Sequence, residues 1–139
     1  MLLATTARGQ QQEVRFDSCT KLGAPVAVLM EDVIMRPQIA ARWNAPQSAD
    51  ETFRKWLQPY LQKSAGGQIT LSLLVAADGH CCLYRIQPNS NVRPDYYLLK
   101  KQVEEIRWVP AYQNNAPVVS TKVLQLSFSG KNLRVHELQ

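Results

Sequence analysis

The segment that decides the fold is "QITLSLLVAADGHCCLYRIQP", Gln68 to Pro88. In its first half apolar residues alternate with Thr70, Ser72 and Leu74, which is the two-residue period of a strand with one buried face. The apolar set is Ile69, Leu71, Leu73 and Val75. Asp78-Gly79 follows, and this dipeptide favours a tight turn because glycine accepts a positive φ without steric cost. The segment therefore predicts a β-hairpin.

The return strand of this hairpin carries two cysteines and is closed by Pro88. Strict alternation predicts one face made of Cys82, Tyr84 and Ile86, and an opposite face made of Cys81, Leu83, Arg85 and Gln87. Adjacent cysteines would then project to opposite sides of the sheet.

A helix and a third strand follow the hairpin. Pro94 and Asp95 open the helix, which cannot continue past Trp108 and Pro110. Its apolar stripe consists of Tyr96, Leu99, Val103 and Ile106. The third strand is "PVVSTKVLQLSF", residues 117–128, with Val118, Leu124, Leu126 and Phe128 on one face. This order predicts an α+β fold, with two layers and one helix packed on a face of a small antiparallel sheet. Residues 132–138, "NLRVHEL", are a candidate fourth strand.

A further helix precedes the hairpin, within "SADETFRKWLQPYLQKSAGG", residues 48–67. Ser48 and Glu51 have the spacing of a capping box, and Pro59 should end or kink the helix near Leu57 or Gln58. The apolar face is formed by Phe53, Trp56, Leu57, Tyr60 and Leu61, which predicts that this helix docks onto the domain.

The chain then divides into an N-terminal tail and irregular arm, residues 1–47, and a domain, residues 48–139, with its core in 68–128. We expect residues 1–20 to be a tail, because they show no convincing period. Residues 24–35 predict either two short strands or one irregular element. The start resembles the end of a secretory signal with a cleavage point after Ala7, and an ordinary frayed terminus explains it equally well.

Composition narrows the function classes. The 139 residues carry a formal charge of +5, but the basic residues are scattered, so we do not expect nucleic-acid binding. No apolar run approaches the ~18 residues of a membrane-spanning helix. Three cysteines allow at most one internal disulfide. We expect three free, buried thiols, with a bridge from Cys19 to Cys81 or Cys82 as the alternative.

The sequence offers little for catalysis. It lacks nucleophile-elbow, zinc-protease and phosphate-cradling motifs, so we expect no enzyme activity, cofactor or metal site. His80 and Cys81 are neighbours on a strand and should not share a proton. The carboxylates of Asp95, Glu104 and Glu105 are explained by a helix cap and a solvated helix face.

The order of these motifs carries a resemblance. A strand, Asp78-Gly79, a second strand, a helix ending in Arg107-Trp108 with Pro110 beyond it, and a strand that begins "PV" and ends "SF" resemble the C-terminal domain of TonB-family proteins. These are periplasmic energy transducers of Gram-negative bacteria. The resemblance covers residues 68–128 and extends back over "ETFRKWLQPYLQ". It makes Trp108 and Pro110 the helix-ending corner of the family.

The resemblance also implies a function. An extended peptide of an outer-membrane transporter, the TonB box, would pair with the third strand by β-strand addition and so couple inner-membrane energy to transport. The candidate peptide-binding residues are Val119, Thr121, Val123, Gln125 and Ser127, together with Gln58 and Tyr60. It further implies a periplasmic location, with contact to an inner-membrane proton-channel complex through an N-terminal membrane segment that this chain does not contain.

Two departures keep alternatives open. Asn115 stands where many family members have glycine, although asparagine also tolerates positive φ. Residues 1–45 match nothing in the family. The alternative function is a stand-alone envelope module that dimerises or binds another envelope protein through the same edge. The third strand is a docking site only if it is exposed; pairing with residues 132–138 would make it a central strand.

Overall fold

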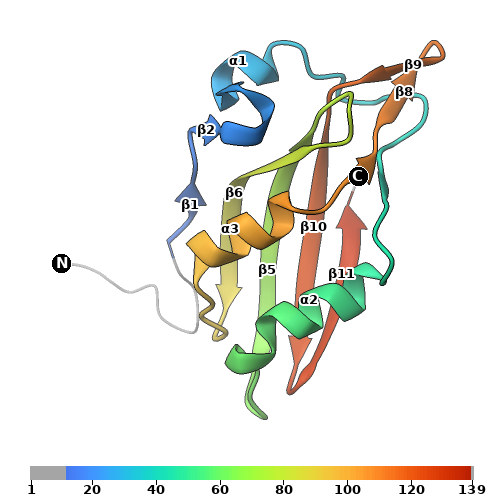
Figure 1. Cartoon of the computed structure of the whole chain (residues 1–139). Helices are drawn as coiled ribbons and strands as arrows, with labels where there is room; N and C mark the ends of the chain where they lie inside the picture. Colours follow the sequence, from blue (N-terminus) through green and yellow to red (C-terminus); the bar gives the residue numbers. More distant parts are fainter. Residues whose placement is uncertain (1–11, 139) are drawn as a thin grey trace.

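The computed structural model describes residues 12–138, and over this range the protein is α+β with antiparallel sheets (Figure 1). The main sheet has five strands in the order β1-β6-β5-β10-β11. Their bounds are β1 Val14–Arg15, β6 Cys81–Ser90, β5 Gly66–Val75, β10 Ser120–Ser129 and β11 Asn132–Leu138. The predicted hairpin is therefore confirmed as β5 and β6, and residues 132–138 do form a further strand.

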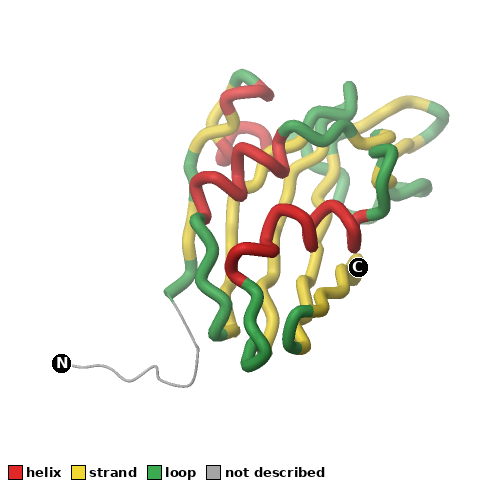
Figure 2. The backbone as a smooth tube through the Cα atoms, turned by 60° about the horizontal axis from the view of Figure 1, so that its bottom comes forward, coloured by secondary structure: helices red, strands yellow, loops and turns green. Residues whose placement is uncertain are grey.

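Two helices, α2 (Ala49–Leu57) and α3 (Tyr96–Glu104), lie over one face of this sheet (Figure 2). The Ser48 hydroxyl caps α2 by accepting a hydrogen bond from the backbone N–H of Glu51 at 3.2 Å. As predicted from Pro59, α2 ends at Leu57, and a short 3-10 helix, η2 (Gln58–Tyr60), continues from it. Asp95 caps α3 in the same way, accepting from the N–H of Leu98 at 3.1 Å.

The main core lies between these helices and the sheet. Helix α2 contributes Phe53 and Leu57, α3 contributes Leu99 and Val103, and the sheet contributes Ile69, Leu71, Leu73, Val75, Leu124, Leu126 and Leu133. This distribution follows from the alternation predicted for β5 and β10. At the rim, Trp108 packs edge-on against Trp43, with ring centroids 5.6 Å apart. The core therefore holds the two helices and the ends of β5 and β10 together.

The face assignment predicted for β6 is wrong beyond its first residues. Ser72 lies opposite Arg85 but Leu73 lies opposite Leu83, so Tyr84 is an extra residue in a β-bulge. The bulge reverses the alternation: Ile86 joins Cys81 and Leu83 in the helix-covered core, and Arg85 moves to the other face. A strict two-residue period could not reveal this shift.

The part of the N-terminal arm around the disulfide lies on the face of the sheet away from the helices, whereas Phe16 and Trp43 of the arm pack against the helix-covered core. Strand β1 pairs with β6, β2 (Ser18–Cys19) pairs with β3 (Ala24–Pro25), and β4 (Arg42–Trp43) pairs with β7 (Trp108–Val109). The 3-10 helix η1 (Thr20–Leu22) and the helix α1 (Val26–Met30) complete it. Residues 24–35 thus contain a two-residue strand, a helix and an isolated bridge at Ile34, so neither two strands nor one irregular element describes them. The expected tail is wrong for the described residues 12–20, and the cleavage point after Ala7 lies outside the described residues.

A disulfide joins Cys19 to Cys82 across a sequence separation of 63 residues. The expectation of three free thiols is therefore wrong, and the alternative bridge is formed with the cysteine on the face away from the helices. Leu22, Val26 and Leu29 of the arm pack around this bridge together with Leu74. Cys81 alone stays reduced, buried on the helix side.

The corner that follows α3 positions the third long strand. Gly79 has φ 90° and its backbone C=O accepts from the N–H of Trp108 at 2.9 Å, so the predicted turn packs directly on the corner. Strand β8 (Ala111–Gln113) and β9 (Ala116–Val118) then form a hairpin that projects at the top of Figure 1. Its turn is Asn114-Asn115, with φ 52° and 65°, so asparagine does take the positive φ expected there. The predicted strand 117–128 is broken at Val119.

Candidate functional site

The third long strand is not an exposed edge. β10 pairs with β5 from Ser120 to Ser129 and with β11 from Val123 to Ser129. The interpretation of residues 117–128 as an open docking edge is therefore wrong, and the alternative of a central strand is confirmed. Val119 packs beside the disulfide, while Thr121, Val123, Gln125 and Ser127 are half-buried. A peptide cannot reach β10 from Val123 to Ser129 through main-chain pairing unless β11 moves away.

The structure instead places β11 at the margin of the sheet, with the N-terminal part of α2 in front of it (Figure 1). Two side chains of α2 contact its backbone. An Asp50 carboxylate oxygen accepts a hydrogen bond from the N–H of Val135 at 2.7 Å, and Arg54 Nη2 donates to the C=O of Leu133 at 3.3 Å. These two backbone groups point away from β10, because residues of alternate register in an antiparallel pair face outward.

Asp50 and Arg54 are four residues apart on one face of α2, and Leu133 and Val135 are two apart on β11. The Asp50 carboxylate and the Arg54 guanidinium group therefore hydrogen-bond the outer edge of β11. In a larger sheet, the main chain of a sixth strand would make these hydrogen bonds. Glu137, the next residue of the same outward register, has no such helix contact in the described part of the chain. The edge is thus partly covered and open toward its C-terminal end.

Two hollows lie on either side of Arg54. One, of about 550 Å³, follows β11 and is lined by Asp50, Arg54, Phe128, Leu133, Arg134 and His136 among others. The other, of about 480 Å³, is lined by Gln47, Glu51, Arg54, Lys55, Gln58, Leu61 and Lys131. Arg54 Nε is buried without a hydrogen-bond partner among the described residues. Arg54 therefore lies between two hollows at the margin of the sheet, with Asp50 lining one and Glu51 the other.

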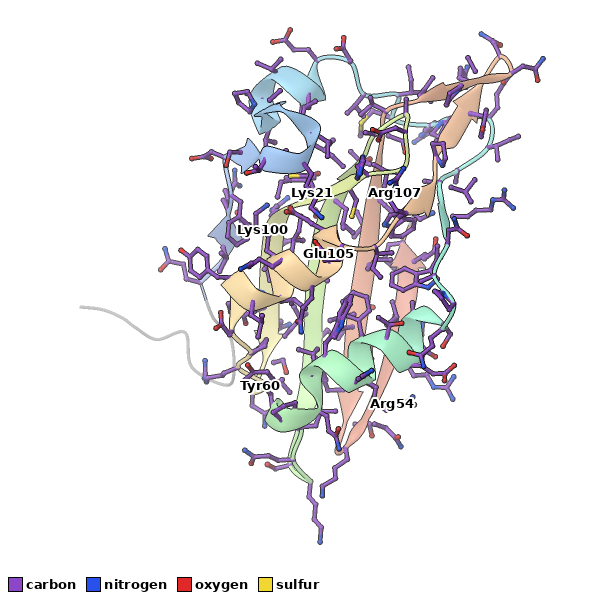
Figure 3. All side chains as sticks on the ribbon, in the orientation of Figure 1. Lys21, Arg54, Tyr60, Lys100, Glu105 and Arg107 are labelled. Atoms are coloured by element: carbon purple, nitrogen blue, oxygen red, sulfur yellow. A yellow bond between two sulfur atoms is a disulfide. The ribbon has the colours of Figure 1, made fainter. Side chains whose placement is uncertain are left out.

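The two predicted site residues near α2 separate in the structure. Gln58 is exposed and lines the second hollow, next to Arg54. Tyr60 is half-buried and packs against the main core. Figure 3 labels both Arg54 and Tyr60, and shows Arg54 beside β11 and Tyr60 at the other end of the helical segment. Gln58 thus stays in the candidate site, and Tyr60 lies away from it.

The ionisable groups near the hairpin do not form a nucleophilic pair. His80 Nδ1 lies 2.9 Å from an Asp78 carboxylate oxygen, and this hydrogen bond lowers the pKa of Asp78. The Cys81 thiol donates instead to the C=O of Val103 at 3.3 Å. Burial, with a smaller effect of the Glu104 carboxylate, raises the pKa of Cys81 to about 12. Within residues 12–138 no three metal-ligating side chains gather to hold an ion, and no helix is long and apolar enough to cross a membrane.

Glu104 has a role that its sequence pattern does not reveal. The expectation of a solvated helix face is wrong for this residue, because its side chain is 10% exposed and ion-paired to Lys100 Nζ at 2.5 Å. The same carboxylate accepts from the backbone N–H of Leu83 at 2.8 Å. Leu83 adjoins the bulge at Tyr84, where the ladder of β6 is disrupted. Glu105, by contrast, is exposed and paired with Lys21, as a solvated face predicts; Figure 3 shows this pair beside Lys100.

Comparisons with protein families, curated proteins and solved structures found no match for this chain. The functional interpretation therefore rests on the residues, the sheet order and the covered edge.

Proposed function

We propose that this chain is a TonB-like protein-interaction domain of the periplasm. It binds an extended peptide of an outer-membrane transporter by strand addition, and the peptide docks along the outer edge of β11. The observation that carries the proposal is the margin of the sheet, where Asp50 and Arg54 contact the main chain of β11 in place of a further strand. In an energy transducer, a membrane segment elsewhere in the protein would link this domain to an inner-membrane proton-channel complex.

The sheet order supports the proposal. The strand-strand-helix-strand unit expected from the TonB resemblance corresponds to β5, β6, α3 and β10. β11 pairs with β10 on the side where the resemblance puts the peptide. The edge that a peptide can reach on this side therefore belongs to β11 and not to β10. Strand addition needs a row of outward N–H and C=O groups, and β11 supplies these at Leu133, Val135 and Glu137.

The two hollows beside Arg54 give the proposal its chemistry. A peptide that displaces Asp50 and Arg54 from the backbone of β11 would leave both charges beside it, with Gln58 further along the same surface. Arg54 could then donate to peptide carbonyls through its buried Nε, which has no partner in the described chain. Without peptide, the side chains of Asp50 and Arg54 are hydrogen-bonded to the backbone of β11; with peptide, the main chain of the peptide takes their place. The N–H and C=O groups of β11 therefore keep a hydrogen-bond partner in the free and in the bound protein.

The disulfide supports export. Disulfides persist in oxidising compartments such as the bacterial periplasm and are rare in reducing ones. The bridge between Cys19 and Cys82 is enclosed by apolar residues of the arm, as expected of a structural bridge.

The test is a titration of the ¹⁵N-labelled protein with a synthetic peptide from the N-terminus of a TonB-dependent transporter. We expect amide shifts from Leu133 to Glu137 and at Gln58, and smaller shifts across β5. The matched control is the same peptide with alternate amides N-methylated, in two versions that block one edge or the other; each keeps the side chains but removes the main-chain donors of one edge. Absence of shifts along β11 at millimolar peptide, or equal shifts with both methylated peptides, would overturn strand addition at this edge.

The alternative, an envelope module that pairs with itself, uses the same edge and gives a different result. Self-pairing through β11 would produce a concentration-dependent increase in mass without any peptide. A proline at Val135, whose outward N–H would be lost, should abolish it.

A further inference from the structure

A third hollow lies at the opposite end of β11, in line with the strand. β11 ends opposite Val123 of β10, and Ile34 of the arm pairs with Ser120 further along the same side. Between these two neighbours the structure leaves a slot of about 600 Å³. Its lining comprises Met35, Arg36, Pro37, Ala40 and Ala41 of the arm, Ser120 to Val123 of β10, and Leu138 of β11.

The floor of the slot carries two buried polar side chains on one face of β10. Ser120 is 1% exposed, and its Oγ has no hydrogen-bond partner among the described residues. Lys122, two residues on, has a side chain that is 8% exposed and an ammonium group that pairs with Glu137 at 2.6 Å. An ammonium group has three N–H donors, so donors remain for a further acceptor.

The chemistry of this lining is specific. A buried hydroxyl without a partner costs free energy unless a ligand satisfies it. Lys122 and Arg36 give the slot two cations, and none of its lining residues is acidic. The remaining lining residues include apolar Met35, Pro37, Ala40, Ala41, Val123 and Leu138. The complementary ligand therefore has an anionic group with two or more acceptor oxygens, joined to a short apolar stem.

We propose that this slot is a binding site for a carboxylate on an aliphatic stem, held by Ser120 Oγ and Lys122 Nζ. In the absence of ligand the ammonium group of Lys122 is paired with Glu137. When the ligand binds, the ammonium group contacts both Glu137 and the carboxylate of the ligand. The carboxylate comes from a free aliphatic acid or from an acidic side chain of a peptide, since both present the same group. The site shares Glu137 with the peptide edge at Leu133 to Glu137, but it uses the side chain of that residue and not its main chain, and it does not depend on the proposed function.

The experiment uses the full chain and butanoate as the probe, with 1-butanol as its neutral counterpart. We expect butanoate to shift the amides from Ser120 to Val123 saturably, and 1-butanol to shift them at least about tenfold more weakly, because it lacks the charge that meets Lys122. A blocked tripeptide, acetyl-Ala-Glu-Ala-amide, forms the second arm. Tighter binding of the tripeptide than of butanoate assigns the site to peptides, and the reverse order assigns it to free acids.

Three variants make the test specific. Lys122→Met should abolish the butanoate shifts while the protein stays folded, since the partner Glu137 is 45% exposed and its carboxylate can stay hydrated once the ammonium group is removed. Ser120→Ala should weaken binding several-fold. Glu137→Gln should strengthen it, because the internal competitor for the ammonium group is removed; a purely structural ion pair predicts no such gain.

Matched controls exist on the same strand and turn. Ser129→Ala and Lys131→Met repeat two of these changes at the other end of β10, outside the slot, and both should leave butanoate binding unchanged. Shifts that persist in Lys122→Met, or that are lost equally in Lys131→Met, would overturn the proposal, as would the absence of saturable shifts at tens of millimolar butanoate.

Discussion

Asp50 of α2 accepts a hydrogen bond from the backbone N–H of Val135 at 2.7 Å, so a helix carboxylate covers the outer edge of the sheet. Uncovered edges tend to pair with other chains, and native proteins block them with charged side chains. The same contact that protects β11 must open if a peptide is to add there. Under the proposed function, Asp50 and Arg54 would therefore be a removable cover of this edge.

Removal of this cover should favour strand addition. Asp50→Ala frees the N–H of Val135 and is expected to lower the free energy of unfolding by about 1.5–3 kcal/mol, the value of a hydrogen bond to a charged group. It should also raise the apparent mass in light scattering as concentration increases, or tighten peptide binding by about tenfold, which is about 1.4 kcal/mol. Lys101→Ala, an exposed change on α3 and outside both hollows, is the control. Equal mass and equal peptide affinity in the two variants would show that Asp50 does not guard the edge.

The disulfide should contribute strongly to stability. Reduction of the disulfide, or the double change Cys19→Ser with Cys82→Ser, removes a cross-link between residues that are 63 positions apart in the sequence. We expect the free energy of unfolding to fall by about 4 kcal/mol, because the reduced unfolded chain gains conformational entropy. Urea denaturation with and without reductant measures this. Cys81→Ala keeps the bridge and serves as the control, and a midpoint that reductant does not move would contradict the prediction.

The turn at Gly79 should tolerate no side chain. A Cβ at this position would lie 2.3 Å from the backbone oxygen of Trp108, and the residue has a φ of +90°. Gly79→Ala is therefore expected to cost about 2 kcal/mol or more, from steric overlap with backbone and from strain. Gly66→Ala is the matched control, since nothing lies within 4 Å of its Cβ position. Thermal denaturation compares them, and equal losses would contradict a special role for the turn against Trp108.

Local patterns predicted much of this fold. Three features depend on interactions within a few residues and can therefore be predicted from the local sequence. They are the alternation in β5, the capping of α2 by Ser48 and the turn at Gly79. The bulge at Tyr84 does not, because it depends on how β6 meets β5. Its consequence, the burial of Glu104 against the N–H of Leu83, was invisible for the same reason.

The candidate site was harder to predict than the fold. Whether β10 is an edge depends on where residues 132–138 pair, a contact between separate segments that no local period encodes. The cover formed by Asp50 and Arg54 joins positions about 80 residues apart. Asp50 alone looked like an ordinary acidic residue in the first turn of a helix. The pairing of Cys19 with Cys82 rather than Cys81 likewise follows from the face of the sheet on which the arm lies.

The remaining thiol gives a pH-dependent prediction. Burial, with a smaller effect of the Glu104 carboxylate, raises the pKa of Cys81 from 9.0 to about 12. The unfolded chain therefore releases this proton above about pH 9, while the folded chain keeps it. Because the unfolded state binds fewer protons, the free energy of unfolding should fall as the pH rises from about 9 toward 12, by up to about 1.4 kcal/mol per pH unit. Below pH 9 the thiol should contribute no pH dependence.

The control for this prediction is the difference between two proteins, because burial also raises the pKa values of Tyr84 and Tyr96. Urea denaturation of the wild type and of Cys81→Ala between pH 8 and pH 11 should give parallel curves below about pH 9 and a steeper loss for the wild type above it. Iodoacetamide should leave the folded thiol unmodified over the same range, since only the thiolate reacts and the group is buried under α3. Identical pH slopes in the two proteins, or rapid alkylation of the folded chain at pH 9, would show that Cys81 is ionised and accessible.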